Sequence, residues 1–205
     1  MTQPIGPTDV DDVVHAALTT LRSSDLDWSA NAGSLDWTRW ELLAHMADDL
    51  FTYAAQLGVP DARVYVPFGS RADRPGAPDE AIHVQDGAGL DGALLVLESA
   101  GALLAAMVAR APESARAHHI WGQPDRAGVA AMGIVEVLVH MNDLTVGTQT
   151  QWSPPPELCA RILDRLFPDV EVGADPWESL LWATGRFESG SRPRRREWRW
   201  YGDVR

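Results

Sequence analysis

The sequence is poor in cysteine and lacks the marks of secretion. Among its 205 residues, Cys159 is the single cysteine, which excludes an internal disulfide and a zinc site built from cysteines. The amino terminus has neither the charged nor the apolar region of a signal peptide. A chain with these properties fits a reducing cytoplasm, and we therefore expect a cytoplasmic protein.

Basic residues and long apolar runs are also scarce. The chain has 17 basic and 29 acidic residues, which gives a net charge of −12. Because a sequence-independent nucleic-acid binder needs a basic face to neutralise phosphates, we expect no nucleic-acid partner. No apolar run approaches the roughly 20 residues needed to cross a bilayer, so we expect no membrane partner either. One basic patch remains, at residues 192–199.

What is present is helical periodicity. Apolar spacing and end signals predict helices over residues 8–24, 38–57, 90–110, 127–147, 154–167 and 175–186. The start of the second is the clearest, because Thr38 followed by Glu41 forms a capping box. Residues 59–91 predict a long loop with a short extended piece at 63–66, and residues 197–201 alternate as a short strand would.

This pattern predicts an all-α fold, with a helical bundle as the first choice. We expect the bundle to occupy residues 1–170. Residues 171–205 would then form a short appendage, made of a helix and an extended, basic, Trp-rich tail packed on the bundle. The single cysteine falls on the inner face of the fifth predicted helix, where we expect an inert packing residue.

The strongest functional signal is a pair of polar residues inside an apolar helix. Glu136 and His140 are four residues apart, so both point from one helix face. His45, on another predicted helix, completes a set of two imidazoles and one carboxylate, which suits zinc with a position left open. The alternative is an amphipathic helix with a solvated glutamate and an ordinary histidine. Against it, residues 134–139 are otherwise apolar, where an unpaired carboxylate is costly to bury.

Two further sets of residues are candidates for substrate binding. His118 and His119 lie in the loop before the fourth long helix and could supply an acid or base; a solvated loop pair is the alternative. Arg186 and the patch at 192–199 could bind a carboxylated substrate or another anionic group through bidentate contacts. The alternative for the arginines is a solvated tail that balances an acidic body.

Several motifs resemble one enzyme superfamily. Residues 36–45 (DWTRWELLAH) resemble the "W…(L/V)xxH" signature of the DinB/YfiT-like metalloenzymes. Residues 132–144 (MGIVEVLVHMNDL) resemble the "ExxxHxxD" signature of the mycothiol-dependent maleylpyruvate isomerase-like branch. Residues 180–186 (LLWATGR) and 198–200 (WRW) are also similar to actinobacterial proteins of this branch.

The resemblance implies a four-helix bundle of up-down-down-up type with long crossovers, and often a homodimer. It implies a divalent metal, zinc first, held by His45, Glu136 and His140. Asp143, one turn beyond, would orient a ligand, although a capping or solvent-facing role is an alternative. In this family the metal binds a low-molecular-weight thiol, such as mycothiol, as thiolate. The thiolate then adds to, or displaces a group from, a small electrophile.

We expect the chain to depart from the full isomerase in having no separate large carboxyl-terminal domain. This expectation puts isomerase activity on maleylpyruvate in doubt and leaves the substrate class open. The predicted function is therefore a metal-dependent thiol transferase or maleylpyruvate isomerase-like enzyme of unspecified electrophile. The alternative is a non-catalytic metal-binding bundle that serves as a ligand-binding or regulatory module.

Overall fold

The regular secondary-structure elements in the described part of the chain are all helices. The computed structural model describes residues 3–59, 61, 63–188 and 192–204. Its helices are α1 (Pro7–Arg22), α2 (Arg39–Leu57), α3 (Gly89–Arg110), α4 (Arg126–Thr145), α5 (Pro156–Leu166) and α6 (Pro176–Ala183). The predicted all-α class is confirmed, and the helix ends lie close to those that the sequence predicts.

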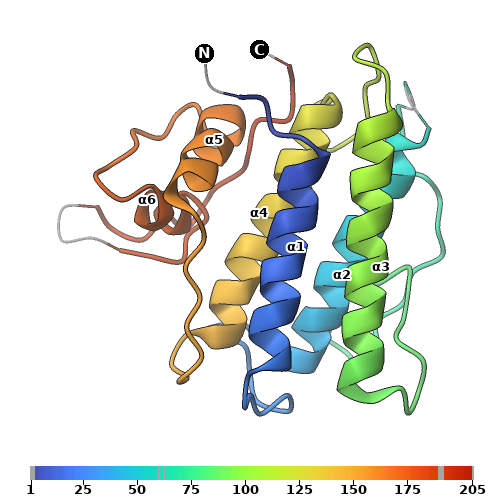
Figure 1. Cartoon of the computed structure of the whole chain (residues 1–205), viewed down its shortest axis with the longest axis vertical. Helices are drawn as coiled ribbons and strands as arrows, with labels where there is room; N and C mark the ends of the chain where they lie inside the picture. The colour runs from blue at the N-terminus through green and yellow to red at the C-terminus, as the bar shows by residue number, and fades with distance from the viewer. Residues whose placement is uncertain (1–2, 60, 62, 189–191, 205) are drawn as a thin grey trace.

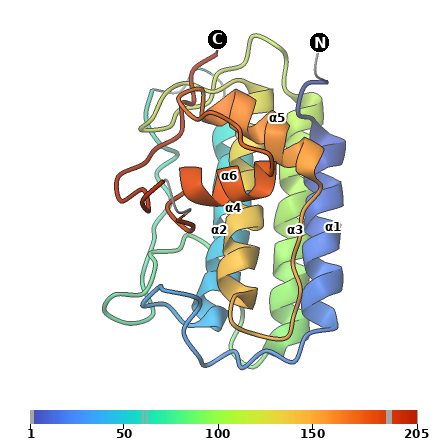
Figure 2. The same cartoon turned by 90° about the vertical axis from the view of Figure 1, so that its left-hand side faces the viewer.

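The four long helices lie side by side, and α5 and α6 pack at one side of α4 (Figures 1 and 2). In Figure 1, α1 and α4 run from top to bottom, whereas α2 and α3 run from bottom to top. Because α2 and α3 run in the same direction, the chain between them has to return along the length of the helices, and the long loop predicted at 59–91 makes this crossover.

Two side-chain caps fix where the helices that carry the candidate site begin. At α2, the Thr38 hydroxyl accepts a hydrogen bond from the Glu41 amide at 3.2 Å, and the Glu41 carboxylate accepts one from the Thr38 amide at 2.7 Å. At α4, Asp125 accepts from the Gly128 amide at 2.8 Å. Each cap satisfies amides that a helix leaves unpaired, and so sets the phase of the polar residues that follow.

Close helix packing depends on two glycines. A Cβ on Gly101 of α3 would lie 2.9 Å from both γ-carbons of Val14 on α1. A Cβ on Gly133 of α4 would lie 2.4 Å from Leu104 of α3. The small residues let α3 approach α1 and α4 closely.

Helices α3 and α4 are each long and apolar enough to cross a membrane by length and composition, which the sequence analysis did not anticipate. In α4, 83% of the most apolar window is buried inside the protein, compared with 44% in α3. The composition of α4 is therefore that of a core helix. The outer face of α3 exposes Leu95 and Leu103.

The expectation of short strands was wrong within the described residues, where only isolated bridges occur. Neither 63–66 nor 197–201 finds a neighbouring strand to pair with. Instead, Trp200 packs edge-on against Trp121, with ring centroids 4.9 Å apart, and the Tyr201 amide donates to the Leu166 carbonyl at 2.8 Å. The alternation at 197–201 therefore reflects aromatic packing of the tail. Residues 189–191 and 205 of the predicted appendage lie outside the described residues.

Candidate metal centre

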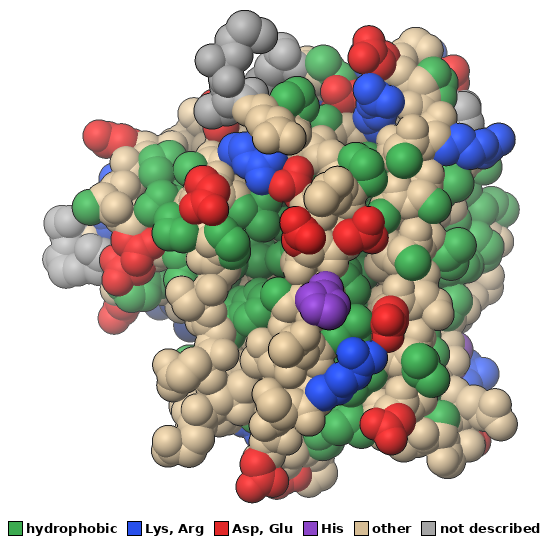
Figure 3. Space-filling view, viewed as in Figure 1, with side chains coloured by type: hydrophobic (Ala, Val, Ile, Leu, Met, Phe, Trp, Pro, Cys, Tyr) green, Lys and Arg blue, Asp and Glu red, His purple; other side chains and the backbone are tan. Residues whose placement is uncertain are grey.

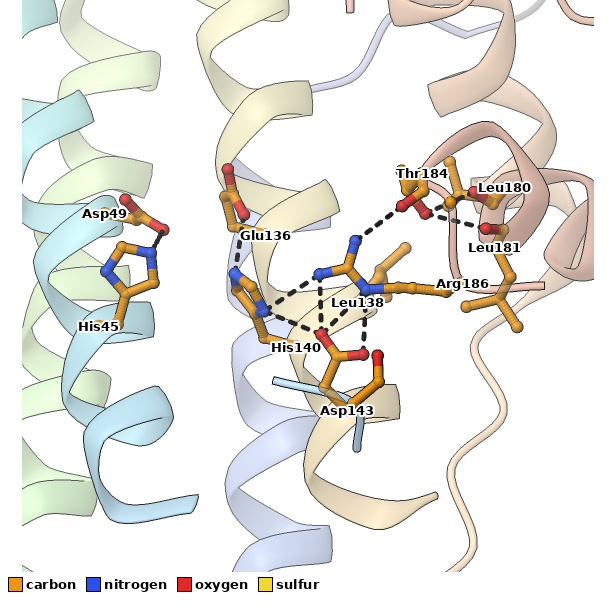
Figure 4. A network of polar contacts seen from close by, with 12 residues as sticks. His45, Asp49, Glu136, Leu138, His140, Asp143, Leu180, Leu181, Thr184 and Arg186 are labelled. Atoms are coloured by element: carbon orange, nitrogen blue, oxygen red, sulfur yellow. Dashed lines mark hydrogen bonds and ion pairs between the residues drawn. The ribbon is translucent and has the colours of Figure 1, made fainter. Parts of the chain in front are cut away.

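Two polar pairs face each other across the interface between α2 and α4 (Figure 4). His45 and Asp49 are four residues apart on α2, and Glu136 and His140 are four residues apart on α4. The His45 and His140 ring centroids are 5.6 Å apart. One ligand atom from each of His45, Asp49 and His140 lies within 4.8 Å of the other two, so these three residues could hold one metal ion.

The Asp49 carboxylate lacks a satisfactory protein partner. Its Oδ2 lies 3.3 Å from His45 Nε2, but the geometry makes no hydrogen bond and this oxygen is buried without one. Buried polar atoms are nearly always paired, and each exception calls for an explanation. A divalent cation between the two helices would satisfy this oxygen. Two imidazoles with a carboxylate are a donor set that suits zinc. The residues present therefore fit a metal.

The charges of the α2 pair also favour a cation. Burial, assisted by the proximity of His140, lowers the pKa of His45 to about 4, so that this ring is neutral at pH 7, as a metal ligand must be. Burial, together with the nearby Glu136 and Asp48 carboxylates, raises the pKa of Asp49 well above its usual value. A neutral histidine cannot offset the cost of ionising Asp49, and a metal ion would.

His140 is held between two carboxylates. Its Nδ1 lies 3.2 Å from Asp143 Oδ2, and its Nε2 lies 3.1 Å from Glu136 Oε2. Burial would lower the pKa of His140, but the hydrogen bonds to Asp143 and Glu136 outweigh it and raise the pKa. For Glu136, burial is likewise outweighed by His140, and its pKa is lowered. The Tyr53 hydroxyl donates to Glu136 Oε1 at 3.3 Å.

The carboxyl-terminal segment reaches α4 through Arg186. Its guanidinium donates hydrogen bonds to Asp143 Oδ2 from Nη2 at 2.8 Å and from Nε at 2.9 Å, and its Nη1 donates to the Thr184 carbonyl at 3.1 Å. The Asp143 side chain is 8% exposed. Asp143 therefore neither caps a helix nor faces solvent. It links Arg186 to His140 and fixes the orientation of the imidazole, which is the role of an outer carboxylate at metal sites.

The structure thus brings together five of the predicted site residues: His45, Glu136, His140, Asp143 and Arg186. Direct ligation by Glu136 stays a prediction, because the close group contains Asp49 in its place. Asp49 was not among the predicted site residues, although His45 and Asp49 have the same four-residue spacing as Glu136 and His140. Applying that spacing to both helices would have found it.

His119 lies in a separate aromatic environment. Its ring centroid is 5.4 Å from both Trp121 and Trp200 and 6.4 Å from Tyr53, and its Nδ1 accepts a hydrogen bond from the Trp121 amide at 3.1 Å. Burial lowers its pKa to about 4. Like the preceding His118, it is partly buried, which argues against a solvated loop pair. Substrate contact by His119 stays a prediction.

The centre is accessible from outside, because the side chains of His45 and Asp49 are 21% and 16% exposed. Trp37 packs edge-on against the His45 ring, with a centroid separation of 4.9 Å, and covers part of it. Comparison with protein-family models, curated proteins and solved structures finds no match. The functional interpretation therefore depends on this geometry and on the sequence motifs.

Proposed function

We propose that this chain is a divalent-metal-dependent enzyme, related to the DinB/YfiT-like group, that activates a low-molecular-weight thiol such as mycothiol. The electrophile that accepts the thiol, or is isomerised by it, is a small molecule. The observation that carries the proposal is the convergence of His45, Asp49 and His140 within 4.8 Å around a carboxylate oxygen with no hydrogen bond. Zinc is the first choice of metal on these donors.

The arrangement of the helices supports the relationship. Helices α2 and α3 run together, antiparallel to α1 and α4, and a long crossover joins α2 to α3. This is the order of directions that the motifs at 36–45 and 132–144 imply for a DinB-like four-helix bundle. The homodimer common in that group is part of the same proposal.

The protein groups have separate roles in this chemistry. A bound divalent cation would hold a thiol as its thiolate at neutral pH. His45 is neutral and ready to ligate, and Asp143 holds the Nδ1 side of His140, whose Nε2 lies beside Glu136. Glu136, 3.1 Å from that Nε2, would be available to accept a thiol proton. The hydroxyl of Tyr53 holds the Glu136 carboxylate in place.

Metal analysis tests the centre. The wild-type protein should contain about one divalent ion per chain, and His45→Ala should lose it. Asp49→Ala and Glu136→Ala, compared side by side, identify which carboxylate ligates, because only loss of a ligand should empty the site. Asp86→Ala, in an exposed loop, is the control. Equal metal content in the wild type and in His45→Ala would refute the proposal.

Activity tests the enzyme. The metal-loaded protein, incubated with mycothiol and a panel of small electrophiles, should consume thiol faster than the metal-free protein. Partial exposure of the centre favours this outcome, since structural metal sites are closed by protein ligands. A protein that binds the metal but shows no turnover with any electrophile would instead be a ligand-binding or regulatory module.

A further inference from the structure

A cavity of about 490 Å³ lies beside the metal centre, between the carboxyl-terminal tail and the end of α4. Figure 2 shows the tail running next to α6 and α4 on this side of the molecule. The cavity shares Asp143 and Arg186 with the centre, but none of His45, Asp49 and His140 lines it. Its other lining residues are Ser34, Leu35, Thr184, Gly185, Arg194, Arg195, Arg196 and Trp198.

The four arginines of this cavity differ in how their charges are compensated. Arg186 is paired with Asp143, and Arg195 is paired with Asp169 at 2.6 Å. Arg194 is also exposed, and among the described residues it donates only to neutral groups, namely the Gly185 carbonyl and the Ser34 hydroxyl. Arg196 is exposed and pairs with no described residue. Two positive charges at one cavity therefore have no ion-pair partner among the described residues, in a protein whose net charge is −12.

That surplus is unusual for this surface. On the face in Figure 3, acidic side chains are spread among apolar and other groups, and basic ones are fewer. Arg195, which lines the cavity, also has a donor without an acceptor among the described residues, because its Nη1 is buried and makes no hydrogen bond, and its guanidinium carbon lies 5.4 Å from the Trp182 ring centroid. A buried guanidinium nitrogen without a partner is costly, and an anion in the cavity would supply the missing acceptor.

The backbone fixes these arginines around the cavity. Gly185 has a φ of +71°, and a Cβ there would lie 2.5 Å from the Arg195 carbonyl oxygen. Only glycine suits both the left-handed conformation and the close approach. The turn after α6 therefore packs closely against the backbone of Arg195 and the side chain of Trp198.

We propose that this cavity binds the anionic group of a small molecule, a carboxylate or a phosphate, through Arg194 and Arg196, with Arg195 Nη1 as a further donor. Guanidinium groups match both anions because their planar donors can bind two oxygens at once. The volume is within the range of small-molecule sites. The sequence suggested Arg186 for anion binding, but its charge is already paired with Asp143. The site does not depend on metal binding.

Calorimetric titration of metal-free protein at low ionic strength tests the proposal. The probes are inorganic phosphate, succinate and the neutral analogue succinamide. Phosphate or succinate should bind, and succinamide should not; whichever anion binds more tightly identifies the class of ligand. The variant Arg194→Ala/Arg196→Ala should weaken binding about tenfold or more. His45→Ala should bind as the wild type does, which separates this site from the metal centre.

Two controls keep the test decisive. Arg63→Ala/Arg110→Ala removes the same charge from exposed positions elsewhere and should leave the affinity unchanged. Arg196→Ala alone removes no hydrogen bond or ion pair with the described residues, so it should fold normally and still lose affinity. The proposal is overturned if neither anion binds the wild type, or if the cavity double variant binds as tightly as the exposed double variant.

Discussion

Asp49 should reduce the stability of the metal-free protein while being needed to bind the metal. Its carboxylate is 16% exposed, has a buried oxygen without a hydrogen bond, and faces a histidine that is neutral at pH 7. The substitution Asp49→Asn keeps the shape of the side chain and removes the charge. We therefore expect opposite effects on two measurements: a more stable apoprotein and a weaker metal complex.

The size of the stability effect follows from burial. Relieving a buried group that has no satisfactory partner is worth about 1–3 kcal/mol. In a chain of this length, 1 kcal/mol corresponds to a Tm shift of about 2–4 °C. The metal-free Asp49→Asn variant should thus melt several degrees above the wild type at pH 7. Because the pKa of Asp49 is raised in the folded state, this gain should shrink as the pH falls and the wild-type carboxyl becomes protonated in both states.

The assay is thermal unfolding of chelator-treated, desalted protein, followed by the same scan with added zinc. Zinc should raise the Tm of the wild type markedly and that of Asp49→Asn little, since a ligand stabilises only the state that binds it. Asp86→Asn, the same change in an exposed loop, should match the wild type in both scans. An apo variant that is less stable than the wild type, or an equal zinc response in the two proteins, would refute the reasoning.

Three further predictions concern other parts of the molecule. Burial, reinforced by Asp48, raises the pKa of Glu80 to about 8, so the stability of the protein should fall as the pH rises from about 4.5 to 8. Glu80→Gln should remove this loss, which is on the order of 1–4 kcal/mol. Urea unfolding midpoints measured against pH test this, and parallel curves for the two proteins would contradict it. Gly101→Ala should destabilise the protein by about 1–3 kcal/mol, because the new methyl group would lie 2.9 Å from the γ-carbons of Val14. Gly69→Ala is the control, since a Cβ there has open space around it. Equal Tm values for the two variants would count against this packing. Asp143→Asn should reduce metal affinity about 10–100-fold in a metal titration, and unchanged affinity would show that Asp143 does not orient His140.

The helices could be predicted because their signals are local. The Thr38–Glu41 capping box and the apolar period of 127–147 lie within single segments, and each was found where the sequence placed it. The alternation at 197–201 was misleading for the same reason. A strand requires a neighbour, and in this segment the apolar side chains pack on Trp121 instead, a contact that no local pattern specifies.

The candidate site was predictable only where one helix carried the whole pattern. Glu136 and His140 share a turn of α4, so their spacing identified them, and His45 followed from the motif around it. His45 and Asp49 have the same spacing in the sequence, but Asp49 was not predicted from it. Whether His45 and Asp49 can both reach a metal held by α4 depends on the distance between the two helices, and the sequence does not give that distance.

The arginines of the tail show why charge patterns alone cannot assign roles. In the sequence, Arg186, Arg194, Arg195 and Arg196 are equivalent cations. In the structure, the role of each follows from a partner that is distant in sequence or missing: Arg186 is paired 43 residues away, and Arg195 is paired 26 residues away. A paired arginine orients or anchors the chain, whereas one with no acid beside it is available to a ligand. For this reason the metal centre and the neighbouring cavity must be tested with different variants, although Arg186 and Asp143 belong to both.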